Sequence, residues 1–229
     1  MEPECLVHLW TVALDESGAD ELGLLSADER ARAERLRFEL HRRRFAAARC
    51  ALRRILGHCL KTAPGALRFD YSPNGKPSIA GTTLRFNLSH SAGWAVIAVT
   101  RGRELSVDLE EIRDGTDLLA LAERYFAPTE RSAMASAPEA ERPALFYRIW
   151  TRKEAYVKAL GEGLSLELDS FSVSITPEPG PALTASARGA RELDRWRLAR
   201  IPAPSGFASA LVVEGGPVEI RLMEPGERV

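Results

Sequence analysis

Cysteine, long apolar runs and an excess of charge of either sign are all scarce in this sequence. Its 229 residues include three cysteines, Cys5, Cys50 and Cys59. They cannot all pair with one another, and their spacing matches no metal-ligand motif, which argues against a disulfide framework and against a cysteine metal site. We expect Cys50 and Cys59 to be small buried side chains within a helix.

Membrane and secretion signals are also missing. No apolar run reaches the roughly 20 residues that a transmembrane helix needs. The first five residues, Met1–Cys5, have neither the basic start nor the apolar segment of a signal peptide. The formal net charge is −1, too small to draw the chain toward nucleic acid or a membrane surface. We therefore expect a cytoplasmic protein that binds neither.

What the chain does contain is an ordinary globular composition, with 45% hydrophobic and 28% charged residues. Its length corresponds to one large domain or two small ones and suffices to bury a core without disulfides.

The ten residues Ile149–Lys158 predict a helix, because they are good helix formers and no glycine or proline follows until Gly161. Glu154 and Lys158 lie four residues apart, so their side chains leave the same face of that helix. One interpretation is an ordinary surface ion pair worth roughly 0.3–0.5 kcal/mol. The other is a functional pair of a carboxylate and an amine.

A second segment with polar residues in regular positions is Leu105–Glu110, whose alternation predicts a strand with Asp108 and Glu110 on one face. In one interpretation, both acids simply face solvent. If instead they are buried near Glu154, each pair of carboxylates 4 Å apart repels by about 4 kcal/mol at an effective dielectric constant near 20. Only a cation would make that arrangement tolerable, and three carboxylates suit Mg²⁺.

A helical stretch from Ser26 to about Leu60 is rich in arginine. Ser26 is a suitable N-cap, and acids follow it in the first turn. The arginines greatly outnumber the acids; they are Arg30, Arg32, Arg35, Arg37, Arg42, Arg43, Arg44, Arg49, Arg53 and Arg54. This stretch is either a solvated helix face or a site for an anion such as a phosphate, to which arginine makes forked contacts.

Two polar segments lie in the middle of the chain. Tyr71–Pro77 contains Pro-Asn-Gly and predicts a turn that presents Lys76. Asn87–Ser91 interrupts an alternating strand pattern before a buried strand at Trp94–Val99. We interpret Asn87–Ser91 either as a capped turn with a satisfied histidine or as a loop that offers serine and histidine to a phosphate.

The remaining segments predict further helices and strands. Expected helices are Leu118–Phe126 and one beginning at Thr129, and expected strands are Leu6–Leu14, Ser165–Ile175, Trp196–Ile201 and Phe207–Val213. Each half of the chain thus has helices followed by strands and ends in a buried apolar strand, which suggests an internal duplication.

Four of these segments, in this order, resemble the Sfp type of 4′-phosphopantetheinyl transferase. They are Gly75-Lys76-Pro77, Phe86-Asn-Leu-Ser-His-Ser91, Ser106-Val-Asp-Leu-Glu110 and Trp150-Thr-Arg-Lys-Glu-Ala-Tyr-Val-Lys158. The resemblance extends from the arginine-rich helix to about Phe171. One departure is Ser106, where the family usually has glycine; the two acids that follow it are retained.

The resemblance implies an α/β (α+β) fold: a pseudo-dimer of two similar subdomains, each a small antiparallel sheet with packed helices. Residues 1–104 would form the first subdomain and residues 105–229 the second. Coenzyme A and a metal ion would lie at their interface.

The resemblance also implies a role for individual residues. Asp108, Glu110 and Glu154 would hold Mg²⁺, with Mn²⁺ as an alternative, and Glu154 would take the proton of the attacking serine. Lys158 would contact a phosphate and assist the leaving 3′,5′-ADP. Phosphate contacts to coenzyme A would come from Arg44, Arg49, Lys76, Ser89, His90 and Lys158.

The implied reaction moves phosphopantetheine from coenzyme A to a serine of an apo acyl or peptidyl carrier protein. Polyketide or nonribosomal peptide synthesis is the expected setting, and a monomer the expected state. Because carrier proteins are acidic around that serine, Leu118–Phe126, with Arg124 and Tyr125, is our candidate docking helix.

Two other function classes compete with transfer. A binding module that holds coenzyme A without reacting would be distinguished by coenzyme A binding with no modified carrier. A nucleic-acid protein that uses the arginine-rich helix would show salt-dependent DNA affinity; the overall charge balance argues against it.

Overall fold

A computed structural model describes residues 5–16, 23–114, 117–163, 166–176 and 182–224 of the chain. Its strands are β1 (Cys5–Ala13), β2 (Asp70–Tyr71), β3 (Pro77–Ser78), β4 (Leu84–Ser91), β5 (Trp94–Arg101), β6 (Leu105–Glu111), β7 (Phe171–Val173), β8 (Leu183–Ser186), β9 (Trp196–Ala199), β10 (Phe207–Glu214) and β11 (Val218–Met223). Its α-helices are α1 (Ala27–Glu34), α2 (Glu39–Cys59), α3 (Leu118–Tyr125), α4 (Pro128–Ser136), α5 (Arg142–Leu160) and α6 (Arg191–Arg195).

Two main sheets have the orders β11-β1-β5-β4 and β6-β10-β9. In the first sheet, β1 pairs antiparallel with β5, and β5 pairs antiparallel with β4. In the second sheet, β6 pairs antiparallel with β10, and β10 pairs antiparallel with β9. In both halves, helices lie in the chain between the first strand and the later pair of strands. This repetition of strand, helices and paired strands confirms the predicted α+β fold with two similar halves. The last strand, β11, runs parallel to β1, so the C-terminal end of the described chain completes the N-terminal sheet.

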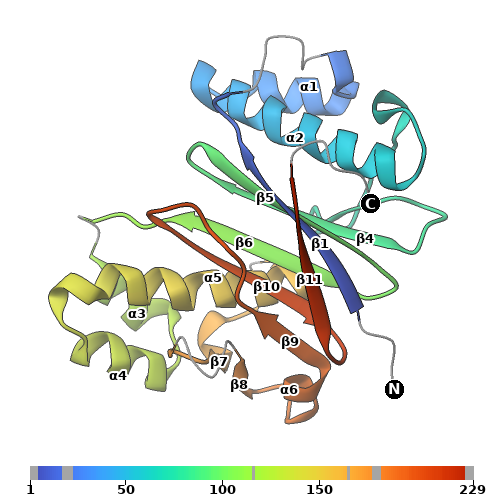
Figure 1. The fold of residues 1–229 in the computed structure, drawn as a ribbon. Coiled ribbons are helices and arrows are strands. Elements are labelled where there is room, and N and C mark those ends of the chain that lie inside the picture. Colours follow the sequence, from blue (N-terminus) through green and yellow to red (C-terminus); the bar gives the residue numbers. More distant parts are fainter. Residues whose placement is uncertain (1–4, 17–22, 115–116, 164–165, 177–181, 225–229) are drawn as a thin grey trace.

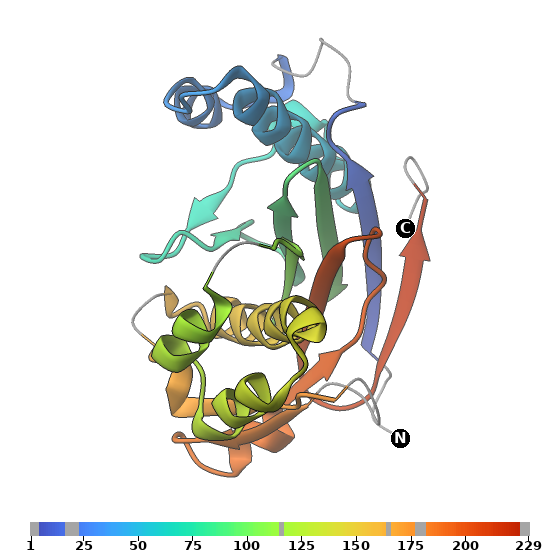
Figure 2. The same ribbon diagram turned by 90° about the vertical axis from the view of Figure 1, so that its left-hand side faces the viewer.

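Figures 1 and 2 show α1 and α2 at one end of the molecule and α3, α4 and α5 at the other, with β4, β5 and β6 between them. One core joins α2 to the first sheet through Leu52, Leu56 and Phe86. A second core surrounds α5 and includes residues of β9 and β10. A third core is shared by both sheets and holds Val96 of β5 beside Val107 of β6. The halves are therefore fused through a common apolar interior.

The predicted helix from Ser26 to about Leu60 is wrong as a single helix, because it is interrupted between α1 and α2. The interruption folds α1 back on α2, and Glu29 of α1 then pairs with Arg49 and Arg53 of α2. The predicted N-cap is confirmed, since Ser26 and Glu29 form a capping box.

The polar segment Asn87–Ser91 is also corrected: it is the second half of β4, not a loop. The chain reverses after it, at Ala92 with φ 47° and Gly93. The predicted strand at Ser165–Ile175 shortens to β7, and Ser165 lies outside the described residues. The other predicted strands and helices correspond to β1, β5, β6, β9, β10, α3 and α4.

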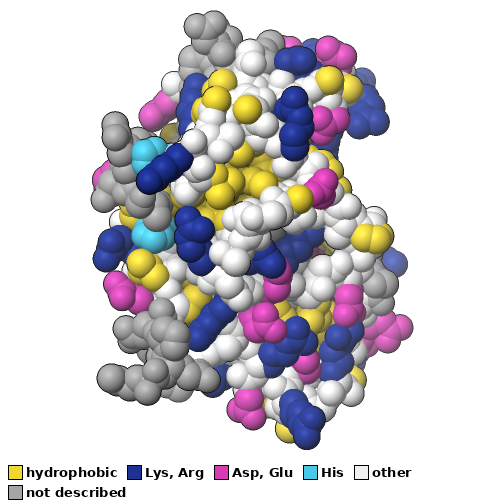
Figure 3. Space-filling model, turned by 90° about the vertical axis from the view of Figure 1, so that its right-hand side faces the viewer, with side chains coloured by type: hydrophobic (Ala, Val, Ile, Leu, Met, Phe, Trp, Pro, Cys, Tyr) yellow, Lys and Arg dark blue, Asp and Glu magenta, His cyan; other side chains and the backbone are white. Residues whose placement is uncertain are grey.

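The helix predicted at Ile149–Lys158 is confirmed within α5, which ends at Gly161 with φ 71°. In the described part of the chain, no helix is both long and apolar enough to span a bilayer. On the face shown in Figure 3, lysine and arginine side chains are interspersed with acidic ones, around an apolar area in the upper half of that view.

Candidate active site

Four of the predicted site residues meet where β6 lies against α5. Asp108 and Glu110 project from β6, and Glu154 and Lys158 project from the facing helix. Asp108 is 1% exposed, and its Oδ1 atom lies 2.5 Å from Lys158 Nζ. The ion pair of Lys158 thus joins the two elements instead of remaining within one helix.

The carboxylates are close enough to perturb one another. Burial, followed by the charges of Asp108 and Glu154, raises the pKa of Glu110 above its usual value. Burial and then Asp108 likewise raise the pKa of Glu154. Burial lowers the pKa of Lys158, but Asp108, Glu154 and Glu110 together outweigh it, and the net shift is upward. The amine is therefore the cation that these carboxylates share.

This donor set fits a hard divalent cation. Asp108 Oδ2 is buried and has no hydrogen-bond partner among the described residues, and such an atom normally requires one. Carboxylate oxygens are the ligands that Mg²⁺ prefers. Within the described residues, no three acidic, histidine or cysteine side chains already converge as a finished metal cluster. Lys158 Nζ provides the positive charge beside Asp108 in this arrangement.

Ser89, one of the predicted phosphate contacts, lies in the same site, within hydrogen-bond distance of Asp108 and Lys158. It is buried on β4, and its hydroxyl donates to Asp108 Oδ1 at 3.0 Å. Ser89 Oγ in turn accepts from the amide of Leu109 at 3.3 Å and from Lys158 Nζ at 3.3 Å. All hydrogen-bonding capacity that a serine hydroxyl offers is thus used inside the protein.

His90 faces a cationic pocket on the other side of β4. The pocket is lined by Arg32, Phe45, Ala48, Arg49, Tyr71, Gly75, Pro77, Asn87, Leu88 and His90. Desolvation, followed by the charges of Lys158 and Arg32, lowers the pKa of His90, although part of the imidazole stays exposed. The neighbours of this histidine are cations, which is the environment expected for an anion site.

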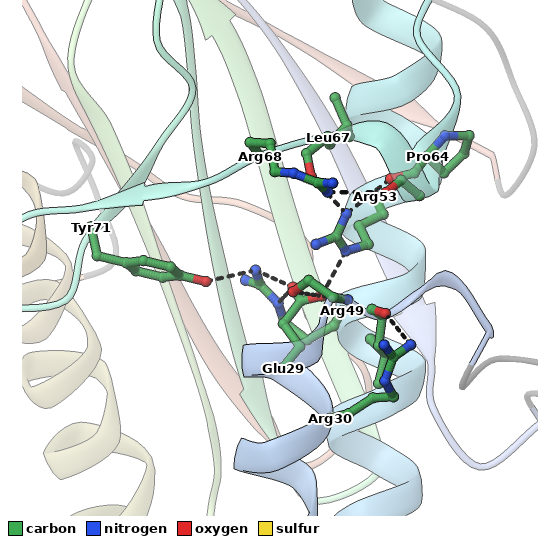
Figure 4. A network of polar contacts seen from close by, with 11 residues as sticks. Glu29, Arg30, Arg49, Arg53, Pro64, Leu67, Arg68 and Tyr71 are labelled. Atoms are coloured by element: carbon green, nitrogen blue, oxygen red, sulfur yellow. Dashed lines mark hydrogen bonds and ion pairs between the residues drawn. The ribbon is translucent and has the colours of Figure 1, made fainter.

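Arg49 contributes to this pocket from within a polar network (Figure 4). Its Nε donates to Glu29 Oε1 at 2.6 Å, and its Nη2 donates to the hydroxyl of Tyr71 at 3.3 Å. Arg53 binds the other oxygen of Glu29 and is 1% exposed. Burial raises the pKa of Glu29, but the two arginines and the Ser26 amide outweigh it and leave that pKa lowered. Glu29 therefore stays ionised and fixes the direction of Arg49.

Two other predicted phosphate ligands are paired with carboxylates. Lys76 Nζ lies 2.7 Å from Glu104 Oε2 and donates to the carbonyl of Ala159 at 3.2 Å. Arg44 makes a forked contact with Asp15, with both distances at 2.7 Å. The structure thus brings His90 and Arg49 together in one pocket and places Lys76 at the end of α5.

Sequence reasoning named Ser91, Asn87 and Arg32 only within longer segments and assigned none of them an individual role. Ser91 Oγ donates to Glu110 Oε2 at 3.0 Å, and Arg32 lines the pocket of His90. A signal for the β4 residues exists in the sequence: polar residues 87, 89 and 91 are spaced like residues 106, 108 and 110, with a constant offset of 19. It becomes visible only once Asn87–Ser91 is read as a strand.

Comparison with known proteins gives consistent matches along the chain. Residues 104–212 match the model of the 4′-phosphopantetheinyl transferase superfamily, and residues 10–102 match that of the 4′-phosphopantetheinyl transferase N-terminal region. The 4′-phosphopantetheinyl transferase HetI of Nostoc sp. is 41% identical over 217 residues, which cover 91% of this chain and 88% of HetI. A putative 4′-phosphopantetheinyl transferase of Synechocystis sp. is 35% identical over 78% of this chain and 72% of its own. Sfp of Bacillus subtilis is 36% identical over 48% of each chain.

Proposed function

The chain belongs to the 4′-phosphopantetheinyl transferase superfamily and is a transferase of that kind, and on this premise we propose that it modifies a serine hydroxyl of apo acyl or peptidyl carrier proteins. The products are holo carrier and 3′,5′-ADP, and the carriers belong to polyketide or nonribosomal peptide synthesis. The observation that supports this most is the meeting of three mutually repelling carboxylates with one amine at the β6–α5 contact. Such a site suits phosphoryl transfer, which depends on positioning and on charge neutralisation.

Asp108, Glu110 and Glu154 are the residues we assign to Mg²⁺, with Mn²⁺ as an alternative. When bound, the ion would neutralise negative charge on the pyrophosphate of coenzyme A. The unpartnered, buried Oδ2 of Asp108 supports this assignment.

Glu154 and Lys158 have complementary roles in the proposed reaction. Burial and Asp108 raise the pKa of Glu154, and a higher pKa makes this carboxylate a stronger base toward the serine proton. Lys158 keeps its proton because the surrounding carboxylates raise its pKa. It would therefore offer a positive charge and a donor to the phosphate of the leaving 3′,5′-ADP.

Coenzyme A phosphates would bind in the cationic pocket, in contact with Arg49 and His90 and close to Arg32. Residues 1–104 would then supply the donor site and residues 105–229 the metal ligands and the base. Lys76 and Arg44 would reach a phosphate only by exchanging Glu104 and Asp15 for it, so their contribution is proposed as long-range charge. Ser89 would act indirectly, through its hydrogen bonds with Asp108 and Lys158.

The first experiment is the intact mass of apo carrier proteins after incubation with this protein, coenzyme A and Mg²⁺. We expect one phosphopantetheine to be added to the carrier and the addition to stop with EDTA. The panel should contain fatty-acid, polyketide and nonribosomal-peptide carriers, so that preference is measured together with activity. Clear coenzyme A binding by calorimetry, with no mass gain on any carrier, would contradict the proposal and favour a binding module.

The carrier would dock on α3. A pocket lined by Arg124 and Tyr125 of this helix also contains Glu154 and Val157 of α5, so a carrier on α3 would lie next to the proposed base. Leu119 is 38% exposed on α3 and gives the surface an apolar component. Arginine beside exposed apolar residues suits an acidic, partly apolar partner.

We predict that Leu119→Asp raises the KM for the carrier by about 10-fold, because it adds charge repulsion and removes an apolar contact worth about 1.4 kcal/mol. Coenzyme A affinity should not change. Leu222→Asp is the matched control, since Leu222 is 57% exposed on the distant strand β11. Steady-state kinetics with varied carrier test the prediction, and equal KM values for both variants would exclude α3 as the docking helix.

A further inference from the structure

Strands β4 and β6 belong to different sheets, yet side chains of β4 bind the backbone of β6 directly. Asn87 Oδ1 accepts from the amide of Val107 at 3.1 Å. Ser89 Oγ accepts from the next amide but one, that of Leu109, and Ser91 Oγ accepts from the amide of Glu111 at 3.1 Å. Three side chains at alternate positions thus take the place of a backbone ladder between the two halves.

The two serines of this side-chain ladder repeat one geometry. Each serine hydroxyl accepts the amide hydrogen of one β6 residue and donates its own hydrogen to the carboxylate of the β6 residue just before it. Ser89 donates to Asp108 Oδ1, and Ser91 donates to Glu110 Oε2, both at 3.0 Å. A serine hydroxyl has a single hydrogen to donate, and the incoming amide determines where that hydrogen can point. The ladder therefore fixes the orientation of both carboxylates.

We propose that Ser91 is a positioning residue for the metal site: it holds Glu110 Oε2 and so directs Oε1 toward the position between Glu110, Asp108 and Glu154. This inference rests on the proposed function. Ser91 is the more informative serine, because the two hydrogen bonds given above join it to β6 alone, at Glu110 and Glu111. Ser89 also contacts Lys158, so its replacement would disturb a second site residue. Residues that orient metal ligands typically change metal affinity 10–100-fold when they are replaced.

A merely structural role of Ser91 would be to hold the two halves together. Ser106 provides the comparison, because it lies on β6, bonds the ladder residue Asn87 and is fully buried. Its hydroxyl donates to Asn87 Oδ1 at 3.2 Å, so the acceptor of this hydrogen bond is an amide oxygen and not a carboxylate. Removal of either hydroxyl would weaken the interface, but only Ser91 would affect a proposed metal ligand.

The test is Mn²⁺ binding in the presence of saturating coenzyme A and without carrier, followed by electron paramagnetic resonance of free Mn²⁺. We expect Ser91→Ala to raise the Kd for Mn²⁺ by about 10–100-fold and Ser106→Ala to leave it unchanged. Ser91→Cys, which keeps the size but has only a weak donor, should also lose affinity, and it decides the question if the alanine variant does not fold. Urea unfolding of each variant reports the effect on the interface separately.

The outcomes distinguish this inference from the proposed function. Unchanged Mn²⁺ affinity in Ser91→Ala, or an equal loss in Ser106→Ala, would overturn the role of Ser91 and leave the metal site standing. If the wild-type protein binds no Mn²⁺, the metal site itself is overturned, and the role of Ser91 with it. Wild-type binding that is lost in Asp108→Asn would establish the site on which the comparison depends.

Discussion

Replacing Glu154 with glutamine is expected to lower kcat for carrier modification by roughly 10²–10⁴-fold, the usual contribution of a positioned base. Glutamine has the shape of glutamate but neither accepts a proton readily nor brings a negative charge to a cation. Coenzyme A binding should persist, because the cationic pocket around His90 is built from other elements. Single-turnover kinetics with a saturating apo carrier, together with calorimetry of coenzyme A, would separate the two effects.

The same substitution is not expected to lower the free energy of unfolding. The pKa of Glu154 is raised, so the folded protein disfavours its ionised form at neutral pH. A neutral side chain relieves the repulsion from Asp108, and the free energy of unfolding of the metal-free protein should stay equal or increase. If the variant is at least as stable but less active, the negative charge of Glu154 serves activity at a cost in stability.

Glu167→Gln is the matched control, because Glu167 lines the same pocket as Glu154 but is exposed. It should retain wild-type kcat. A glutamine variant at Glu154 with full activity would remove this residue from the mechanism, and a variant that loses both activity and stability would indicate a structural role instead.

Local patterns in the sequence were sufficient for the elements that hold the four central site residues. The strand period places Asp108 and Glu110 on one face of β6, and the helical period aligns Glu154 with Lys158 on α5. Gly161 ends that helix where expected. These features depend on neighbours within one or two turns, and for that reason they could be predicted.

The role of Asn87–Ser91 could not be predicted in the same way. Polar residues at alternate positions of a strand resemble a turn when the strand is considered alone. Their partners are the amides and carboxylates of β6, about 20 residues further along the chain. Only the packing of the two sheets brings β4 and β6 together, and that information lies outside any local pattern.

The arginine-rich region shows a second limit of local reasoning. Nothing between α1 and α2 is a glycine or a proline, so the sequence gives no local signal for the break. The break allows Glu29 to reach two turns of α2, where Arg53 is buried completely and Arg49 only in part. The number of arginines therefore overstates the charge available to a ligand, because part of it serves the interior.

The most destabilising single change that we predict is Lys153→Met, on the residue before the proposed base. Lys153 is fully buried and lies 2.8 Å from Glu130, which is buried as well. Its other two donors bind the carbonyls of Leu168 at 2.7 Å and Phe171 at 2.6 Å. Burial lowers the pKa of Lys153, and Glu130 opposes that shift. The amine is thus satisfied in all three directions and connects α5 to α4 and β7.

Removal of the amine leaves Glu130 buried with its negative charge. That carboxylate still accepts from the amides of Ala127 at 2.8 Å and Val173 at 2.7 Å, but no cation remains beside it. We expect Lys153→Met to lower the free energy of unfolding by about 3–5 kcal/mol, the usual effect of breaking a buried pair. For a chain of this size, that corresponds to a decrease in Tm of roughly 6–20 °C.

A double-mutant cycle would show whether the pair itself is responsible. If the cost comes from an uncompensated charge, Lys153→Met combined with Glu130→Gln should be more stable than Lys153→Met alone, since no buried charge is left. Arg131→Met is the control for an exposed pair: Arg131 and Glu123 are 30% and 74% exposed, and that variant should cost less than about 1 kcal/mol. Additive effects of the two buried substitutions in urea unfolding would contradict the interpretation. Non-additive effects would mean that Lys153 and Glu130 stabilise the fold as a pair, on the residue of α5 that precedes Glu154.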